Sequence, residues 1–135
     1  MVEGAPVNYV GSSNPITAGK ALAFDGTFVY LAFGDKVGRI RASTGLHEAN
    51  LPTLNQGAQE ALVFDGTSLY ATAVQQVIKL NINSMGLDGS PIAFPGSSNV
   101  VALAFDGTYV YAASQVIATS STGQVSYGNG NVVRF

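Results

Sequence analysis

Apolar residues along this chain fall into short runs separated by turn residues. The stretch ALAFDGTFVY, residues 21–30, places alternating small and large apolar residues before Asp-Gly and an aromatic and β-branched run after it. Asp and Gly both tolerate positive φ, so the dipeptide predicts a tight hairpin between two strands. No segment carries a sustained apolar stripe of period 3.6, which argues against helical solenoids. The pattern predicts an all-β chain.

Close copies of this hairpin occur twice more. ALVFDGTSLY fills residues 61–70 and ALAFDGTYVY fills residues 102–111, so successive copies begin 40 and 41 residues apart. Such a period is typical of the four-stranded blade of a β-propeller. After each hairpin, a run of apolar-x-basic-apolar order predicts a third strand; these runs are residues 37–40, 77–80 and 132–135.

Fourth strands are predicted at residues 48–54 and 91–95. The second of these begins the phrase PIAFPGSSN, and a similar phrase, PVNYVGSSN, opens the chain at residues 6–14. Residues 6–10 are therefore predicted to be a fourth strand as well. The chain would begin with a fourth strand, contain blade units over about 21–54, 61–95 and 102–135, and end with a third strand.

The phrase FDGTxVY followed by Val-x-x-apolar, repeated every forty residues, resembles the YVTN/NHL-type β-propeller repeat. The resemblance implies a propeller fold over most of the chain. It implies no single function, because such propellers serve as scaffolds, adhesins, lectins, hydrolases and virion parts. The chain departs from the pattern in two ways: residues 114–130 are inserted in the third unit, and three units are fewer than the four to eight blades of most propellers.

The offset strand order suggests how three blades could close. An opening strand that contains Val7 and Tyr9 could complete the sheet that ends in Val132, Val133 and Phe135 of a second copy. Two chains would then form a six-bladed homodimeric ring, which leaves no free strand edge at the seams. The alternative is that the chain is a fragment of a longer propeller, divided at a blade boundary.

Composition excludes several classes of function. Hydrophobic residues make up 47% of the chain and charged residues 10%, with a formal net charge of −2. The weak charge argues against nucleic-acid binding. No apolar run is long enough for a membrane span, and the first residues do not predict a secretion signal. Zero Cys excludes disulfides and thiolate metal sites.

Candidate binding residues lie at strand starts and in the insertion. Lys20 and Glu60 precede the innermost strands at equivalent positions and would place alternating charge at the channel mouth of a ring; the alternative is two solvated residues. The insertion, SQVIATSSTGQVSYGNG, mixes an aromatic residue with uncharged polar ones and offers a surface for a protein or glycan partner. The insertion can also be interpreted as an extended hairpin in which residues 115–119 pair with residues 124–127, and this interpretation is compatible with a binding role. Its candidate contact residues are Gln115, Ile117, Tyr127 and Asn129.

Evidence for catalysis or a cofactor is thin. The single His, His47, is predicted in a connection between strands beside Glu48, with no third partner for a triad. Oxygen ligands for Ca²⁺ could come from scattered residues, but their spacing matches no loop motif; they are Asn14, Asp35, Asn55, Glu60 and Asn99. No enzyme, no cofactor and no metal are therefore predicted.

Two classes of function remain. The first is a self-assembling structural or interaction protein, of the kind found among virion and cell-surface components, because low charge and loops rich in Ser, Thr, Asn and Gln suit that role. The second is a lectin-like propeller with pockets lined by Tyr30, Tyr70 and Tyr111. A lectin should repeat its binding residues in every loop set, and these loops differ. The sequence favours the first class, with a hydrolase third.

Overall fold

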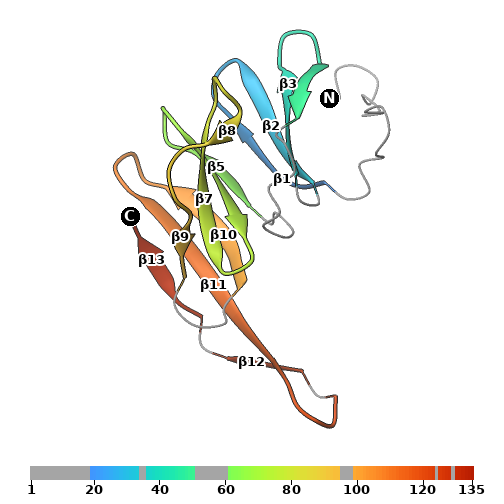
Figure 1. Cartoon of the computed structure of the whole chain (residues 1–135), viewed down its shortest axis with the longest axis vertical. Coiled ribbons are helices and arrows are strands. Elements are labelled where there is room, and N and C mark those ends of the chain that lie inside the picture. The colour runs from blue at the N-terminus through green and yellow to red at the C-terminus, as the bar shows by residue number, and fades with distance from the viewer. Residues whose placement is uncertain (1–18, 34–35, 51–60, 95–98, 124, 129) are drawn as a thin grey trace, which may run out of the picture.

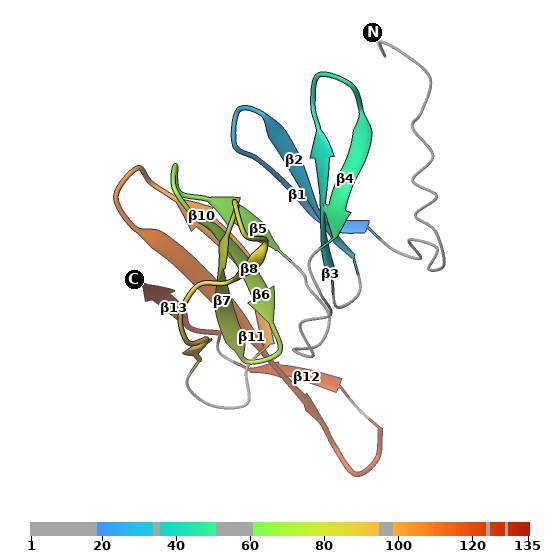
Figure 2. The same cartoon turned by 45° about the horizontal axis from the view of Figure 1, so that its top comes forward.

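The computed structural model describes residues 19–33, 36–50, 61–94, 99–123, 125–128 and 130–135. Over these residues the chain is all-β and forms three antiparallel sheets that follow one another along the chain and lie side by side in space (Figure 1). Figure 2 shows the same succession from another direction. The predicted all-β class is confirmed.

We name the sheets I, II and III in chain order. Sheet I contains β1 (Gly19–Phe24), β2 (Phe28–Phe33), β3 (Lys36–Arg41) and β4 (Leu46–Asn50). Sheet II contains β5 (Leu62–Phe64), β6 (Leu69–Ala73), β7 (Gln76–Asn81), β8 (Gly86–Leu87) and β9 (Ile92–Ala93). Sheet III contains β10 (Asn99–Phe105), β11 (Val110–Thr119) and β13 (Val132–Arg134), and β12 (Val125–Gly128) pairs with the far half of β11.

The three sheets share one register, which makes their positions directly comparable. The tyrosine of each second strand lies opposite the basic residue of the following predicted third strand: Tyr30 faces Arg39, Tyr70 faces Lys79 and Tyr111 faces Arg134. Because side chains alternate between the two faces of a strand, equivalent residues point to equivalent faces. Exposure at one sheet can therefore be compared with exposure at the next.

The Asp-Gly hairpins occur where the sequence predicts them, but Asp and Gly contribute to the turn in different ways. Only the glycine has positive φ: Gly26 has φ of 99°, Gly66 of 96° and Gly107 of 98°. The aspartate instead accepts hydrogen bonds from the turn, as Asp25 Oδ1 does from the N–H groups of Thr27 at 2.8 Å and Phe28 at 2.7 Å. The expectation that Asp also uses its tolerance of positive φ is wrong; its carboxylate is what the turn needs.

Two hydrophobic clusters hold the three sheets together. Between sheets I and II, Tyr30, Ala32 and Val37 of sheet I pack with Leu62, Leu69, Ala71, Ile78 and Leu80 of sheet II. Between sheets II and III, the buried residues are Val77, Phe94, Val100 and Ala112. Each cluster joins the large side chains of one sheet to the small and aromatic side chains of its neighbour, so each inner sheet face is covered by the adjacent sheet.

The predicted fourth strands need correction. In sheet I, β4 begins at Leu46, two residues earlier than predicted; it contains His47, so this residue lies in a strand and not in a connection. In sheet II the fourth position is shared by two short strands, because β8 pairs with the end of β7 and β9 pairs with its beginning. The predicted strand at 91–95 therefore covers only the second half of a broken strand.

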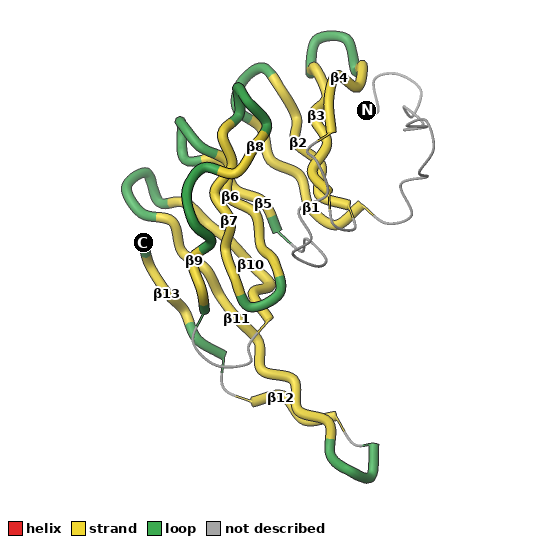
Figure 3. Tube along the Cα trace, in the orientation of Figure 1, coloured by secondary structure: helices red, strands yellow, loops and turns green. Residues whose placement is uncertain are grey.

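The insertion forms an extended hairpin, as the compatible structural interpretation predicts. β11 runs on past its pairing with β10, and its far half pairs with β12 through Val116–Gly128, Ile117–Tyr127, Ala118–Ser126 and Thr119–Val125. The turn closes with a hydrogen bond from the Gly123 N–H to the Ser120 carbonyl at 3.0 Å. In Figure 3 this hairpin extends away from the three sheets, at the end opposite the Asp-Gly turns.

Candidate functional site

The two outermost sheet faces of the chain are the candidate functional surface. The open face of sheet I, directed away from sheet II, is defined here by Leu22, Phe24, Val29, Leu31 and Ile40. The open face of sheet III, directed away from sheet II, is defined by Ala102, Ala104, Tyr111, Ala113 and Val132. Both assignments follow from strand alternation, since Ala21, Ala23 and Tyr30 pack toward sheet II and Leu103 and Ala112 pack toward it from the other side.

Sheet I exposes large apolar side chains whose equivalents elsewhere are covered. Leu22 is 65% exposed, whereas Leu62, its equivalent in sheet II, is 8% exposed. Phe24 is 56% exposed, whereas its equivalent Phe64 packs against the cluster between sheets I and II. The repeat has placed the same large side chains on all three sheets. In sheets II and III a neighbouring sheet covers these side chains. In sheet I, no sheet formed by the described residues covers them.

Sheet III exposes the complementary set of small and aromatic residues. Val132 is 72% exposed, whereas its equivalents Val37 and Val77 are both fully buried. This face has a shallow hollow among its side chains, which are those of Ala102, Ala104, Tyr111, Ala113 and Val132. The corresponding face of sheet I, with Ala21, Ala23, Tyr30 and Ala32, is the one that receives the large side chains of sheet II. The described part of the chain therefore has a face of exposed large apolar residues on sheet I and a face of small and aromatic residues with a shallow hollow on sheet III.

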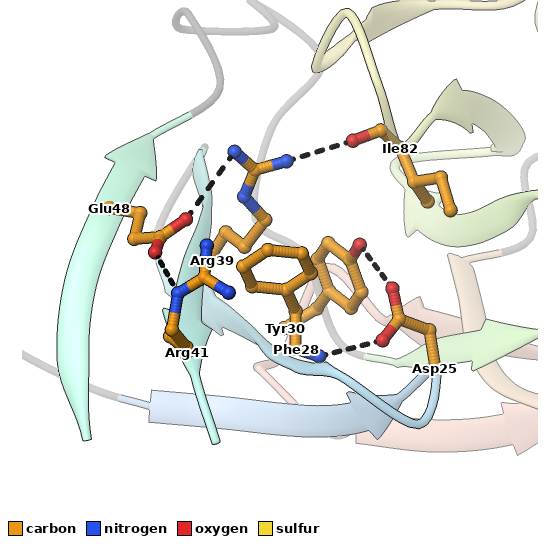
Figure 4. A network of polar contacts seen from close by, with 7 residues as sticks. All are labelled: Asp25, Phe28, Tyr30, Arg39, Arg41, Glu48 and Ile82. Atoms are coloured by element: carbon orange, nitrogen blue, oxygen red, sulfur yellow. Dashed lines mark hydrogen bonds and ion pairs between the residues drawn. The ribbon is translucent and has the colours of Figure 1, made fainter. Parts of the chain in front are cut away.

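A polar network fixes sheet I against sheet II (Figure 4). The Arg39 guanidinium stacks over the Phe28 ring at 4.5 Å and donates a hydrogen bond to the carbonyl of Ile82, in sheet II, at 3.0 Å. Glu48 pairs with Arg39 at 3.8 Å and also with Arg41, whose guanidinium lies 4.9 Å from the same ring. Because Arg39 is charged, planar and stacked, it can direct a donor across the junction between the sheets.

Each Asp-Gly turn carries a second polar contact, between the aspartate and the tyrosine of the next strand. The Tyr30 hydroxyl donates to Asp25 Oδ2 at 2.8 Å, and the Tyr111 hydroxyl donates to Asp106 Oδ2 at 3.0 Å. Burial opposes ionisation of Asp25, but the hydrogen bonds from Phe28, Thr27 and Tyr30 outweigh it and lower its pKa. Burial, reinforced by the bond to Asp25, raises the pKa of Tyr30.

These contacts explain the repeated phrase and the role of its tyrosine. Tyr30 is fully buried between sheets I and II, so it belongs to the core rather than to a pocket open to solvent. Tyr70 lies half-buried, with its ring centroid 5.8 Å from that of Phe135. The spacing of five residues between Asp and Tyr, present in all three copies, is the signal in the sequence that could have identified this pair.

The predicted binding residues do not gather into one site among the described residues. Lys20 lies on β1 and is exposed, and Glu60 lies outside the described residues. Gln115 is half-buried on β11, and Ile117 pairs through its backbone with Tyr127 of β12. Asn129 lies outside the described residues. The hairpin is thus present as a surface element, while the predicted ring of charge at a channel mouth stays a prediction.

The predicted ring-closure residues divide into two groups. Val132 lies on the open face of sheet III, but Val133 and Phe135 pack inward against the cluster between sheets II and III. The side chains of these two residues therefore serve the interior of the chain, and the Phe135 backbone already exchanges two hydrogen bonds with Val110, each of 3.0 Å. Among the described residues, no strand pairs with β13 on the side away from β11. Val7 and Tyr9 lie outside the described residues.

The described part of the chain contains no group of three or more His, Cys, Asp or Glu residues that could hold a metal ion. Of the five oxygen ligands considered for Ca²⁺, only Asn99, at the start of β10, lies within it. Glu48 pairs with Arg39 and Arg41. In the same residues, no helix has the length and apolar character needed to cross a membrane.

Comparison with known proteins supports the fold alone. No protein-family model matches the sequence, and no curated protein matches it. Among solved structures, the chain is similar to the computationally designed Ika4 protein, with a TM-score of 0.59, 18% identity, and coverage of 86% of this chain and 93% of that one. It is also similar to a luciferin-regenerating enzyme, with a TM-score of 0.64, 19% identity, and coverage of 90% of this chain and 45% of that one.

A third similar structure is a chain of the nidogen/laminin complex, with a TM-score of 0.63, 15% identity, and coverage of 87% of this chain and 48% of that one. This chain thus spans about half the length of the last two structures. The three similar structures are a designed protein, a member of a protein complex and an enzyme. They support a propeller-like succession of sheets and favour none of these activities.

Proposed function

We propose that the protein is a self-assembling structural component, in which two copies close into a six-bladed β-propeller ring. The observation that carries the proposal is the pair of open faces at the ends of the chain. Leu22 is 65% exposed and Val132 is 72% exposed, although Leu62 and Val77, their equivalents in sheet II, are buried. A second copy that presents its sheet I to the sheet III of the first would cover both. Fully burying a leucine or phenylalanine side chain is worth about 1.5–3 kcal/mol.

The occupant of these faces is a second copy because the chain already contains the required interface twice. Sheet I meets sheet II, and sheet II meets sheet III, by the same fit of large residues against small and aromatic ones. A third junction of this kind joins the last sheet of one copy to the first sheet of the next. Two such seams close a ring of six blades, within the usual range for propellers.

Closure also accounts for the edge of β13 to which no described strand is paired. A fourth strand contributed by residues 6–10 of the second copy would pair there and complete the third blade. Exposed strand edges favour pairing with another chain, so a completed seam protects the protein from uncontrolled association. The ring would present two β11–β12 hairpins to a partner, which suits a virion or cell-surface component better than an enzyme.

Two matched substitutions test the proposal. Leu22→Asp places a charge at the seam and is expected to convert the dimer to monomers. Leu46→Asp is the control, because Leu46 is 66% exposed, equally large, and lies on β4 outside both open faces. Native mass spectrometry and analytical ultracentrifugation measure the outcome. Dissociation by Leu22→Asp alone supports the proposal; a parent protein that is already monomeric, or a Leu22→Asp variant that stays dimeric, contradicts it.

A further inference from the structure

The stacked arginine at the junction of sheets I and II has a counterpart on the open face of sheet III. Arg134 lies opposite Tyr111 as Arg39 lies opposite Tyr30. Its guanidinium stacks over the Tyr109 ring at 4.2 Å, as that of Arg39 stacks over Phe28 at 4.5 Å. Tyr109 and Phe28 occupy the same place in the repeat, three residues after the turn aspartate. The same stacked pair is therefore built twice.

Sheet II lacks this device. At the equivalent positions it has Ser68 and Lys79, and Lys79 pairs with Asp88 of its own sheet at 3.4 Å. The arginine-aromatic pair is thus not a general requirement of the repeat. At sheet I it serves a contact across the junction, because Arg39 donates to the carbonyl of Ile82. Arg134 has the same stacked geometry on a face that no described residue covers.

The acceptor for Arg134 follows from the repeat. Ile82 is the first residue after β7, and the first residue after β3 in sheet I is Ala42. Ala42 is exposed and its N–H donates to the Thr27 carbonyl at 3.0 Å, so its peptide is held in place at the end of the strand. Within the chain, sheet II packs on sheet I and its Ile82 carbonyl accepts from Arg39. If sheet I of a second copy packs on sheet III in the same way, its Ala42 carbonyl takes the corresponding position beside Arg134.

We infer that Arg134 is the positioning residue of the seam, donating across it to the Ala42 carbonyl of a second copy. This inference rests on the proposed ring and adds its register: the interface is directional, from sheet III of one copy to sheet I of the other. The charged, planar donor fixes the angle at which the large residues of sheet I enter the hollow of sheet III. If sheet I packed against sheet III in a shifted register, the Arg134 guanidinium would lose its acceptor. The shifted arrangement is therefore disfavoured.

The first test compares Arg134 with Arg39, the two arginines that stack on an aromatic ring at equivalent positions of the repeat. Arg134→Ala is expected to raise the dissociation constant of the dimer by about tenfold or more, as loss of a hydrogen bond from a charged donor predicts. Arg39→Ala lies within the chain and is expected to lower the urea midpoint of unfolding while leaving that constant within about twofold. Sedimentation velocity over a concentration series measures the constant, and circular dichroism confirms that both variants are folded.

A second test separates the contact from the packing of Arg134 on Tyr109. In the parent background, Ala42→Glu is expected to tighten the dimer and Ala42→Lys to weaken it. Combining Arg134→Glu with Ala42→Lys should recover at least part of the affinity that either change removes alone. A dimer that responds to none of these changes overturns the seam register while leaving the proposed ring in place. A parent that is monomeric at all concentrations overturns both.

Discussion

The Tyr30 hydroxyl donates a hydrogen bond to Asp25 Oδ2 at 2.8 Å, joining a buried strand to the turn that precedes it. Asp25 Oδ1 meanwhile accepts from two N–H groups of that turn. One carboxylate thus shapes the hairpin and fixes the side chain that fills the junction between sheets I and II. This combination gives the repeated phrase FDGTxVY a physical reason for both its Asp and its Tyr.

Removing the hydroxyl should cost stability without changing the fold. Tyr30→Phe is expected to lower the free energy of unfolding by about 1.5–3 kcal/mol, because a hydrogen bond to a charged acceptor is lost while the ring still fills its place. Urea unfolding of Tyr30→Phe, Asp25→Asn and the double variant measures their coupling. Strictly additive effects would show that the two residues do not act as a pair.

The same turns predict sensitivity to acid. Hydrogen bonds from backbone N–H groups and tyrosine lower the pKa of Asp25 and Asp65 against the opposing effect of burial, and backbone N–H groups lower that of Asp106. A carboxylate with a lowered pKa in the folded state contributes stability above its unfolded pKa, near 4. That contribution is lost as the pH falls through the folded pKa.

Urea unfolding between pH 7 and pH 3 at fixed protein concentration therefore should show falling stability below about pH 4. Changing all three turn aspartates to asparagine should lower stability at pH 7 and flatten its decline in acid. An unchanged acid dependence in this triple variant would assign the decline to other groups.

The turn glycines offer a test of backbone conformation alone. A Cβ at Gly26 meets no atom within 4 Å, so a substitution there is opposed by the φ of 99° and not by crowding. Gly26→Val is expected to cost about 1–3 kcal/mol, and Gly66→Val and Gly107→Val similar amounts. Gly26→Asn is the matched control and should cost less, because asparagine tolerates this region. Equal stability of the Val and Asn variants would contradict the explanation.

The opening segment is predicted to complete a seam. Deleting residues 1–10 removes the strand proposed to pair with β13 and should weaken or abolish the dimer, while sheets I to III remain folded. The measured quantities are the native mass and the thermal unfolding midpoint of the truncated protein. A truncated protein that stays dimeric with an unchanged midpoint would show that the seam does not use this strand.

The β11–β12 hairpin is predicted to contact a partner or a neighbouring ring. The other strand pairs of sheet III do not involve the hairpin, since β10 and β13 pair with the near half of β11. Replacing residues 117–127 with Asn-Gly should leave the protein a dimer of the shortened chain and remove higher assembly or binding in a glycan and cell-surface screen. A shortened protein that assembles and binds like its parent would place the binding surface elsewhere.

Much of the fold could be predicted from the sequence because it rests on local signals repeated three times. The spacing of FDGT, the third strands of apolar-x-basic-apolar order and the hairpin in the insertion all depend on residues near one another in the chain. The broken fourth strand of sheet II could not be predicted in this way. β8 and β9 are two residues each, and pairing with β7 defines them more than their own pattern does.

The candidate site was harder to predict because it depends on which faces are covered. Leu22 and Leu62 are the same residue in the same phrase, and only the neighbouring sheet distinguishes 65% exposure from 8%. The contact from Arg39 to Ile82 joins residues 43 positions apart and is invisible to a local pattern. Self-association is predicted from the number and order of strands, and the exposed side chains of sheets I and III define the surfaces for which it is proposed.

The native mass of the full chain tests self-assembly most directly. Native mass spectrometry of the purified protein, repeated over a dilution series, should give twice the 13.9 kDa of one chain and, on dilution, an equilibrium with that single-chain mass. A mass of one chain throughout would contradict self-association, and a mass of three chains would contradict the six-bladed ring.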